Sequence, residues 1–285
     1  MVVGGGNNLG PAVAEHHVES AGSRLAVHVD GDGPPVVLLH GLTAAHRYVV
    51  MGSRRLGRSG HRVIAYDARG HGDSSPAPAR DAYGYAELER DLEAVMDALG
   101  LDRAVLAGVS MGAHTAIRLA LSAPARVGGL VVITPGYDPA TQEDRRRLER
   151  WDALADGLEH RGVDGFLEAY GDGGVAERWR QASLAAVRQR MERHRDPGAV
   201  ADALRVVPRD RPFGGLDELR ALSIPVTVVA SGDEADPGHP RALAEAYAEA
   251  IPGALVRTEE PGSSPLAWQG SQVSAVIADV AREAG

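Results

Sequence analysis

A serine between two glycines is the residue of this chain whose type and spacing best suit chemistry. Ser110 lies in the pentapeptide Gly108-Val109-Ser110-Met111-Gly112. A serine hydroxyl becomes a useful nucleophile only when a base accepts its proton and the backbone presents it clear of neighbouring atoms. The glycines favour such a presentation, because they lack a Cβ and let a strand turn sharply into a helix. The pattern predicts a strained, accessible serine, and the identity of its base decides which chemistry follows.

The runs on either side of the pentapeptide fit a strand that turns into a helix. Residues 104–107 form a short apolar run, and the Ala- and Leu-rich run 113–123 ends before Pro124. Similar apolar runs predict strands at 13–20, 25–29, 35–39, 62–66, 130–134, 224–230 and 255–258. Helical periodicity predicts helices leading up to Leu56 and at 85–99, 241–251 and 269–284. Because strands and helices alternate, the sequence predicts an α/β protein with a mostly parallel sheet and helices on both faces.

The alternation stops between residues 139 and 212, where three helical sets of apolar residues replace the strands. We expect this insertion to lie over the carboxyl edge of the sheet as a helical cap. Trp151 and Trp179 then help to build a lid and a substrate pocket, or they serve as ordinary packing residues. The chain is expected to divide into a disordered tail at 1–12, a core at 13–136 and 216–285, and the cap at 137–215.

Composition excludes several kinds of site and partner. The net charge is −9, and no basic stripe suggests a nucleic-acid partner. The absence of cysteine excludes disulfides and thiolate chemistry. The N-terminus has no signal-peptide pattern, and no apolar run approaches the ~18 residues that would span a bilayer. We expect a cytoplasmic protein with a small-molecule substrate, no membrane partner and no cofactor, and the oligomeric state is left open.

With these motifs in place, the chain resembles the α/β-hydrolase family over nearly its whole length. The matching pieces are the strand-ending His40-Gly41, the loop Asp67-x-Arg69-Gly70-x-Gly72-x-Ser74 and the serine pentapeptide, which corresponds to the family's nucleophile elbow. The resemblance implies an eight-stranded sheet with a helical cap, and it makes Ser110 the nucleophile. It also implies an oxyanion hole formed by the backbone N–H groups of Leu42 and Met111, while His40 and the Asp67 loop are scaffold.

The same resemblance places the catalytic acid in the turn after the strand that ends at Ala230. Three carboxylates compete there, and Asp236, which precedes Pro237, matches the family better than Asp233 or Glu234. Asp138, after the preceding strand, is the alternative position that some members use.

The catalytic histidine is where the sequence departs from the family's pattern. Ser263 stands where the family has histidine, and no histidine follows His239. His239 is the candidate replacement, because it lies three residues beyond Asp236, but its position before Pro240 fits a helix-start residue better. His46 is interpreted as a pocket residue or a solvated helix start, and His114 is expected to face solvent or another element. No His-x-x-x-His spacing predicts a metal site.

Three functions are compatible with these residues. The first is a hydrolase that cleaves a small ester or other acyl substrate through Ser110, with a displaced base such as His239. The second is a cofactor-free lyase, cyclase or isomerase that polarises a carbonyl on the same scaffold. The third is a ligand-binding relative whose triad has decayed. The first is favoured, because decay gives no reason to preserve a strained serine between two glycines.

Overall fold

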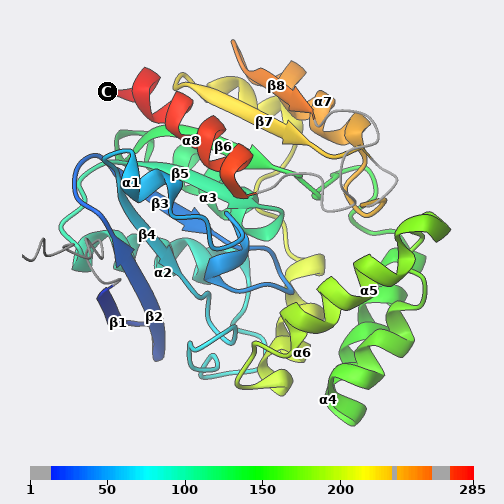
Figure 1. Ribbon diagram of the computed structural model, residues 1–285. Helices are drawn as coiled ribbons and strands as arrows, with labels where there is room; N and C mark the ends of the chain where they lie inside the picture. The colour runs from blue at the N-terminus through cyan, green and yellow to red at the C-terminus, as the bar shows by residue number, and fades with distance from the viewer. Residues whose placement is uncertain (1–13, 233–235, 259–269) are drawn as a thin grey trace, which may run out of the picture.

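A twisted eight-stranded sheet forms the centre of the computed structural model, which describes residues 14–232, 236–258 and 270–285 (Figure 1). The strands are β1 (Ala14–Ser20), β2 (Ser23–Asp30), β3 (Pro35–Leu39), β4 (Arg62–Tyr66), β5 (Ala104–Val109), β6 (Val127–Ile133), β7 (Val226–Ala230) and β8 (Leu255–Thr258). Their order is β1-β2-β4-β3-β5-β6-β7-β8. β2 runs antiparallel to β1 and β4, and every other pairing is parallel. The predicted α/β class with a mostly parallel sheet is therefore confirmed.

Helices cover both faces of the sheet, which explains why its central strands are continuously apolar. One face packs against α1 (Arg55–Arg58) and α8 (Gly270–Ala284), and the other against α2 (Tyr85–Ala98), α3 (Met111–Ser122) and α7 (Arg241–Ala250). Figure 1 shows α8 crossing the first of these faces. All seven residues of β6 and all five of β7 are buried. The parallel strands thus end together at one edge, where loops can carry functional groups.

The helix expected to lead up to Leu56 is much shorter than predicted. A 3-10 turn, η1 (His46–Tyr48), and the four-residue α1 are the only helical parts of this connection. Between them Met51 and Gly52 have φ angles of 47° and 72°. A right-handed helix cannot pass through residues in the left-handed region, so the backbone breaks there.

Three long helices lie together at one end of the molecule, between β6 and β7 in the chain (Figure 1). These inserted helices are α4 (Arg145–Tyr170), α5 (Glu177–Met191) and α6 (Pro197–Val206). The side chains of Asp144 and Asp196 accept hydrogen bonds from backbone N–H groups in the first turns of α4 and α6. The apolar faces of the three inserted helices share one buried cluster with Leu42 and Met111 of the core. The insertion therefore packs against the segments that flank the serine.

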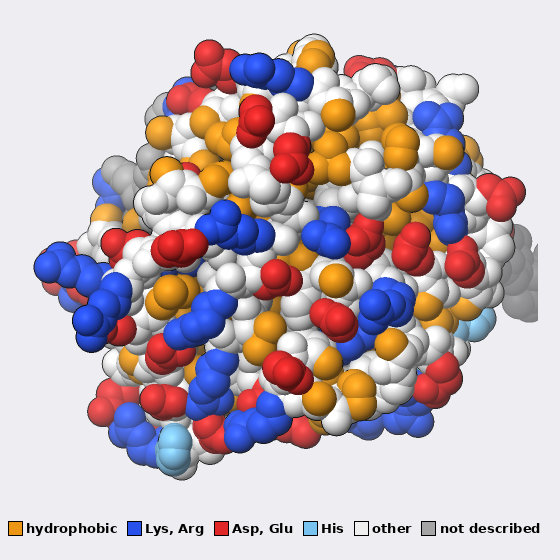
Figure 2. Space-filling model, turned by 180° about the vertical axis from the view of Figure 1, so that it is seen from behind, with side chains coloured by type: hydrophobic (Ala, Val, Ile, Leu, Met, Phe, Trp, Pro, Cys, Tyr) orange, Lys and Arg blue, Asp and Glu red, His pale blue; other side chains and the backbone are white. Residues whose placement is uncertain are grey.

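The remaining ordered turns are short, and the surface is mixed in charge. They are the 3-10 segments η2 (Pro124–Arg126), η3 (Val207–Arg209) and η4 (Leu216–Ala221). Figure 2 shows acidic and basic side chains interspersed over the face opposite the view of Figure 1. In the described part of the chain, none of the helices has the length and apolar character needed to cross a membrane.

Candidate active site

The turn from β5 into α3 holds Ser110 in a strained conformation. Its φ and ψ angles are 48° and −111°, and its backbone N–H donates to the carbonyl of Ile133 at 3.0 Å. A Cβ on Gly108 would lie 2.3 Å from the carbonyl carbon of Gly112, and one on Gly112 would lie 2.3 Å from the carbonyl oxygen of Leu39. Only glycine fits at either position, so the two glycines permit the sharp turn that the sequence predicted.

His239 and Asp236 lie beside this serine. His239 Nε2 is 3.0 Å from Ser110 Oγ, and His239 Nδ1 is 2.8 and 2.9 Å from the two carboxylate oxygens of Asp236. A carboxylate accepts only, so Nδ1 carries the proton and Nε2 is left to accept from the serine hydroxyl. The side chains of His239 and Asp236 are 26% and 37% exposed, so neither is sealed in the core.

The segment that carries both residues is a tight turn at the start of α7. The backbone N–H of His239 donates to the carbonyl of Asp236 at 3.1 Å, and Pro240 immediately precedes the helix. His239 is therefore a helix-start residue and a neighbour of Ser110 at once, so the two interpretations offered by the sequence are compatible.

The protonation states of this pair follow from their mutual contact. Burial lowers the pKa of His239 and the charge of Arg190 lowers it further, but Asp236 outweighs both and the net pKa is raised. Burial raises the pKa of Asp236, but the charge and hydrogen bond of His239 outweigh it and the net pKa is lowered. Asp236 thus stays ionised and stabilises a proton on His239.

Two backbone amides flank the serine. A Cβ on Gly41 would lie 3.7 Å from Ser110 Cβ, so the segment that continues to Leu42 rests against the turn after β5. The carbonyl of Leu42 accepts a 2.6 Å hydrogen bond from His71 Nε2, which fixes the orientation of this segment. Within the described residues, the N–H groups of Leu42 and Met111 donate to no protein acceptor. The role of these two amides as an oxyanion hole stays a prediction.

Three buried histidines fasten the loops around the serine through backbone amides. His40 Nε2 accepts from the N–H of Ala68 at 2.9 Å, and His194 Nδ1 accepts from the N–H of Gly72 at 3.0 Å. His114 Nε2 accepts from the N–H groups of Gly136 and Tyr137, both at 3.1 Å. Burial is the main reason that their pKa values fall, to about 4 for His40 and about 3 for His114 and His194. All three are neutral acceptors that hold the site together.

The structure also decides among the sequence's other candidates. His114 was expected to face solvent or another element. It is 3% exposed and faces the loop after β6, so it faces another element. Asp138 accepts from the N–H of Ala140 at 2.9 Å and from Thr141 Oγ1 at 3.3 Å, and so closes a local turn instead of meeting an imidazole. The remaining candidates, Asp233, Glu234 and Ser263, lie outside the described residues.

Sequence reasoning assigned no role to Gly136, which borders the site. A Cβ at this position would lie 3.0 Å from His239 Cδ2 and 3.5 Å from Ser110 Oγ. The signal that could have found it is its place, since it follows a buried strand that pairs with β5. A side chain there would press on the imidazole.

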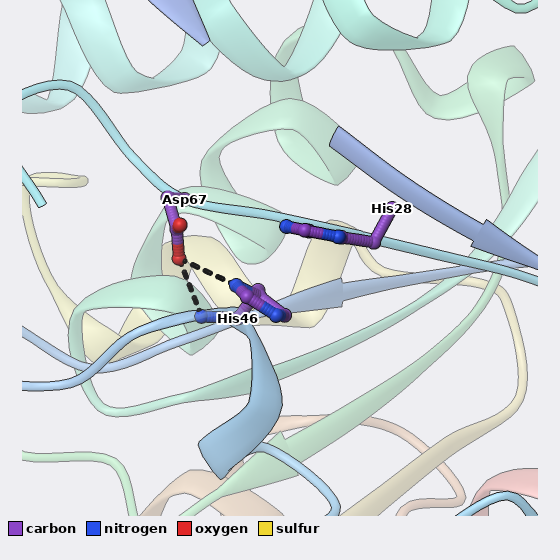
Figure 3. A group of neighbouring side chains, drawn as sticks. All are labelled: His28, His46 and Asp67. Carbon is purple, nitrogen blue, oxygen red and sulfur yellow. Dashed lines mark hydrogen bonds and ion pairs between the residues drawn. The ribbon is translucent and has the colours of Figure 1, made fainter. Parts of the chain in front are cut away.

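One further group could be taken for a metal site. His28, His46 and Asp67 bring their donor atoms within 4.8 Å of one another (Figure 3). His46 Nδ1 lies 3.0 Å from Asp67 Oδ1, and the two imidazoles stack with centroids 3.8 Å apart and planes 23° apart. A metal binds an imidazole in the plane of the ring, and the lone pairs of stacked rings run side by side instead of converging. We therefore assign this group to holding the Asp67 loop, and the expectation of no metal stays a prediction.

Comparison with known proteins identifies the scaffold. Residues 34–158 match the family model described as the alpha/beta hydrolase fold. The chain has the α/β-hydrolase fold. It is 42% identical over 108 residues to the sn-1-specific diacylglycerol lipase ABHD11 of Mus musculus, an alignment that covers 37% of this chain and 34% of the lipase. The chain spans 34% to 44% of the length of the first curated relatives it matches.

Solved α/β hydrolases align over nearly the whole chain. A thermophilic esterase from Thermogutta terrifontis is 26% identical with a TM-score of 0.74, covering 95% of this chain and 99% of the esterase. An N-acyl homoserine lactone degrading enzyme is 25% identical with a TM-score of 0.71, covering 94% of this chain and 99% of its own. Several of the proteins that this chain resembles are thus named for hydrolytic activities.

Proposed function

We propose that this α/β hydrolase is a serine hydrolase that cleaves a small ester or other acyl compound. The observation that carries the proposal is the 3.0 Å contact between His239 Nε2 and Ser110 Oγ, with Asp236 on the other imidazole nitrogen. A nucleophile within hydrogen-bond reach of a base that a third group orients is the arrangement that acyl transfer needs.

In the proposed reaction, Ser110 Oγ attacks the substrate carbonyl while His239 Nε2 takes the hydroxyl proton. General-base help of this kind is worth roughly 10²–10⁴-fold. The carbonyl oxygen gains negative charge and meets the N–H groups of Leu42 and Met111, each worth ~3–4 kcal/mol of transition-state stabilisation. His239 returns its proton to the departing oxygen as the acyl–oxygen bond breaks. A water molecule then attacks the acyl-serine, His239 accepts its proton, and Ser110 leaves as a hydroxyl.

The proposed triad draws its acid and its base from one short turn. By the family resemblance the histidine would follow β8, where Ser263 stands in this sequence. His239 supplies an imidazole from the turn before α7 instead, three residues after Asp236. The geometric roles of a triad do not depend on the order of its residues along the chain.

The names of the relatives and the surroundings of Ser110 support acyl hydrolysis. The lipase, the esterase and the lactone-degrading enzyme act, by their names, on acyl compounds. Around the two candidate oxyanion amides, Leu42 and Met111 join the apolar cluster of the inserted helices. We propose that these helices act as a cap whose apolar side chains receive the acyl part of the substrate.

A fluorophosphonate probe, which reacts with activated serines, tests the proposal. We expect stoichiometric labelling of the wild-type protein and none of Ser110→Ala, together with hydrolysis of p-nitrophenyl esters that His239→Gln lowers by at least ~10²-fold. Turnover of a carbonyl compound that survives in Ser110→Ala would instead support a lyase, cyclase or isomerase. Absence of labelling beside tight binding of a small molecule would support a binding protein.

A further inference from the structure

The turn that carries His239 is tied to the core through the helix that follows it. In the described part of the chain, the backbone hydrogen bonds of residues 236–240 stay within the turn or run to α7. The carbonyl of Pro240 accepts from the N–H groups of Leu243 and Ala244, at 3.0 and 3.4 Å. Because the turn continues directly into the hydrogen-bonded helix, the position of α7 determines where the imidazole lies.

The position of α7 is fixed by a buried tyrosine hydroxyl. Tyr247, in the last turns of α7, is 0% exposed, and its hydroxyl donates to the carbonyl of Tyr137 at 2.7 Å. Tyr137 lies in the segment that follows β6 and is itself 3% exposed. A buried carbonyl that loses its donor is left unsatisfied, which is costly. The hydrogen bond therefore holds α7 at a set distance from this segment.

The same segment is held from the side of the nucleophile by α3. The N–H groups of Gly136 and Tyr137 both donate to His114 Nε2 at 3.1 Å, and the N–H of His114 donates to the carbonyl of Ser110 at 3.0 Å. His114 thus lies one helical turn beyond the serine. Residues 136–137, with the side chains of His114 and Tyr247, form a bridge from the helix after Ser110 to the helix after His239.

The bridge also touches the two side chains that it spans. A Cβ on Gly136 would lie 3.0 Å from His239 Cδ2, 3.3 Å from His239 Nε2 and 3.5 Å from Ser110 Oγ. The backbone that His114 and Tyr247 hold is therefore the wall beside the imidazole. If α7 moved away from this wall, His239 would move away from Ser110.

We propose that Tyr247 is a positioning residue for acyl hydrolysis, whose hydroxyl keeps His239 Nε2 within hydrogen-bond distance of Ser110 Oγ. The inference rests on the proposed function of Ser110. The Tyr247 hydroxyl bonds to the Tyr137 carbonyl and to neither side chain of the reacting pair, so it acts through the bridge. A misplacement of about 1 Å in a catalytic group can cost on the order of 10²-fold in rate. Loss of this hydroxyl should therefore slow the chemical step and leave substrate binding in place.

The variant Tyr247→Phe tests the inference, because it keeps the ring and removes only the hydroxyl. We expect kcat for p-nitrophenyl butyrate to fall by at least ~10-fold while KM stays within about 2-fold of the wild type. Tyr83→Phe is the control, because Tyr83 is 2% exposed and its hydroxyl accepts from the N–H of Ala77 at 3.1 Å, outside the bridge. Both variants lose one buried hydrogen bond, so both should lower the urea midpoint, but Tyr83→Phe should keep the wild-type kcat.

A double substitution shows whether Tyr247 acts through the imidazole. If it does, Tyr247→Phe/His239→Gln should turn over the ester no more slowly than His239→Gln alone, because there is no imidazole left to misplace. The inference is overturned if Tyr247→Phe retains the kcat of Tyr83→Phe, or if it lowers turnover by the same factor with and without His239. In either case, labelling of Ser110 by the fluorophosphonate probe still supports the proposed function. If the wild-type protein is neither labelled nor active on the ester, the proposed function fails, and the inference fails with it.

Discussion

Lowering the pH from 7 to 5 should destabilise this protein strongly, because His40, His114 and His194 can hold their loops only as neutral acceptors. Each accepts a backbone N–H hydrogen bond, which a protonated nitrogen cannot do. Their pKa values in the folded protein are about 4, 3 and 3, against 6.5 for an ordinary histidine. Between these values the unfolded chain binds more protons than the folded one, so stability falls as the pH falls.

The size of the effect follows from the same pKa values. At pH 5 an ordinary histidine is protonated and these three are not, which costs about 2 kcal/mol for each, or roughly 6 kcal/mol in all. His239 opposes the trend, because its raised pKa stabilises the folded state in acid and loses this contribution as the pH rises through the folded pKa. The net loss is still comparable to the whole stability of a typical domain, about 5–15 kcal/mol.

Urea unfolding followed by tryptophan fluorescence at pH 7, 6 and 5 measures this loss. His114→Gln keeps a neutral acceptor, so its free energy of unfolding should fall less between pH 7 and pH 5, by about 2 kcal/mol. His16→Gln, which replaces an exposed histidine on β1, should leave the dependence unchanged. The assignment of these imidazoles as neutral acceptors would be refuted if the free energy of unfolding falls by less than about 1 kcal/mol between pH 7 and 5. It would also be refuted if that free energy depends on pH equally in His114→Gln and in the wild type.

Two further predictions concern His239. Asp236→Asn should lower kcat/KM by roughly 10²–10⁴-fold. In the wild type we expect the acid limb of the pH–rate profile above pH 6.5, because Asp236 raises the pKa of His239. Asp236→Asn removes that charge and should move the acid limb to lower pH. An acid limb that stays in place or moves to higher pH contradicts this prediction. Gly136→Ala places a methyl group 3.0 Å from His239 Cδ2 and should lower ester turnover by at least ~10-fold without changing the urea midpoint. Unchanged turnover in that variant would mean that the imidazole does not depend on the space beside it.

Much of the fold was predictable because burial on both faces leaves a direct mark on the sequence. Strands such as β3 and β6 are continuously apolar, and the glycines around Ser110 indicated the sharp turn after β5. The connection before Leu56 was mispredicted, because apolar spacing does not reveal that Met51 adopts a positive φ. Local backbone conformations of this kind depend on tertiary packing.

The site was harder to predict than the fold, because its contacts join distant parts of the chain. Spacing alone showed that His239 follows Asp236, but only the turn before α7 reveals that the imidazole lies between that carboxylate and Ser110. The position of His114 on one face of its helix could not show which loop this side chain holds. The catalytic roles of these residues stay predictions.

The closeness of Asp236 and His239 along the chain makes their contact independent of the wider architecture. A carboxylate and an imidazole held by one turn keep their alignment even if neighbouring strands shift, whereas partners on separate loops require the whole sheet to stay in register. Residues 236–240 therefore form a short local motif that could be placed before a helix of another protein. Because one turn carries both residues, a displacement of this turn would separate both groups from Ser110 in a single step.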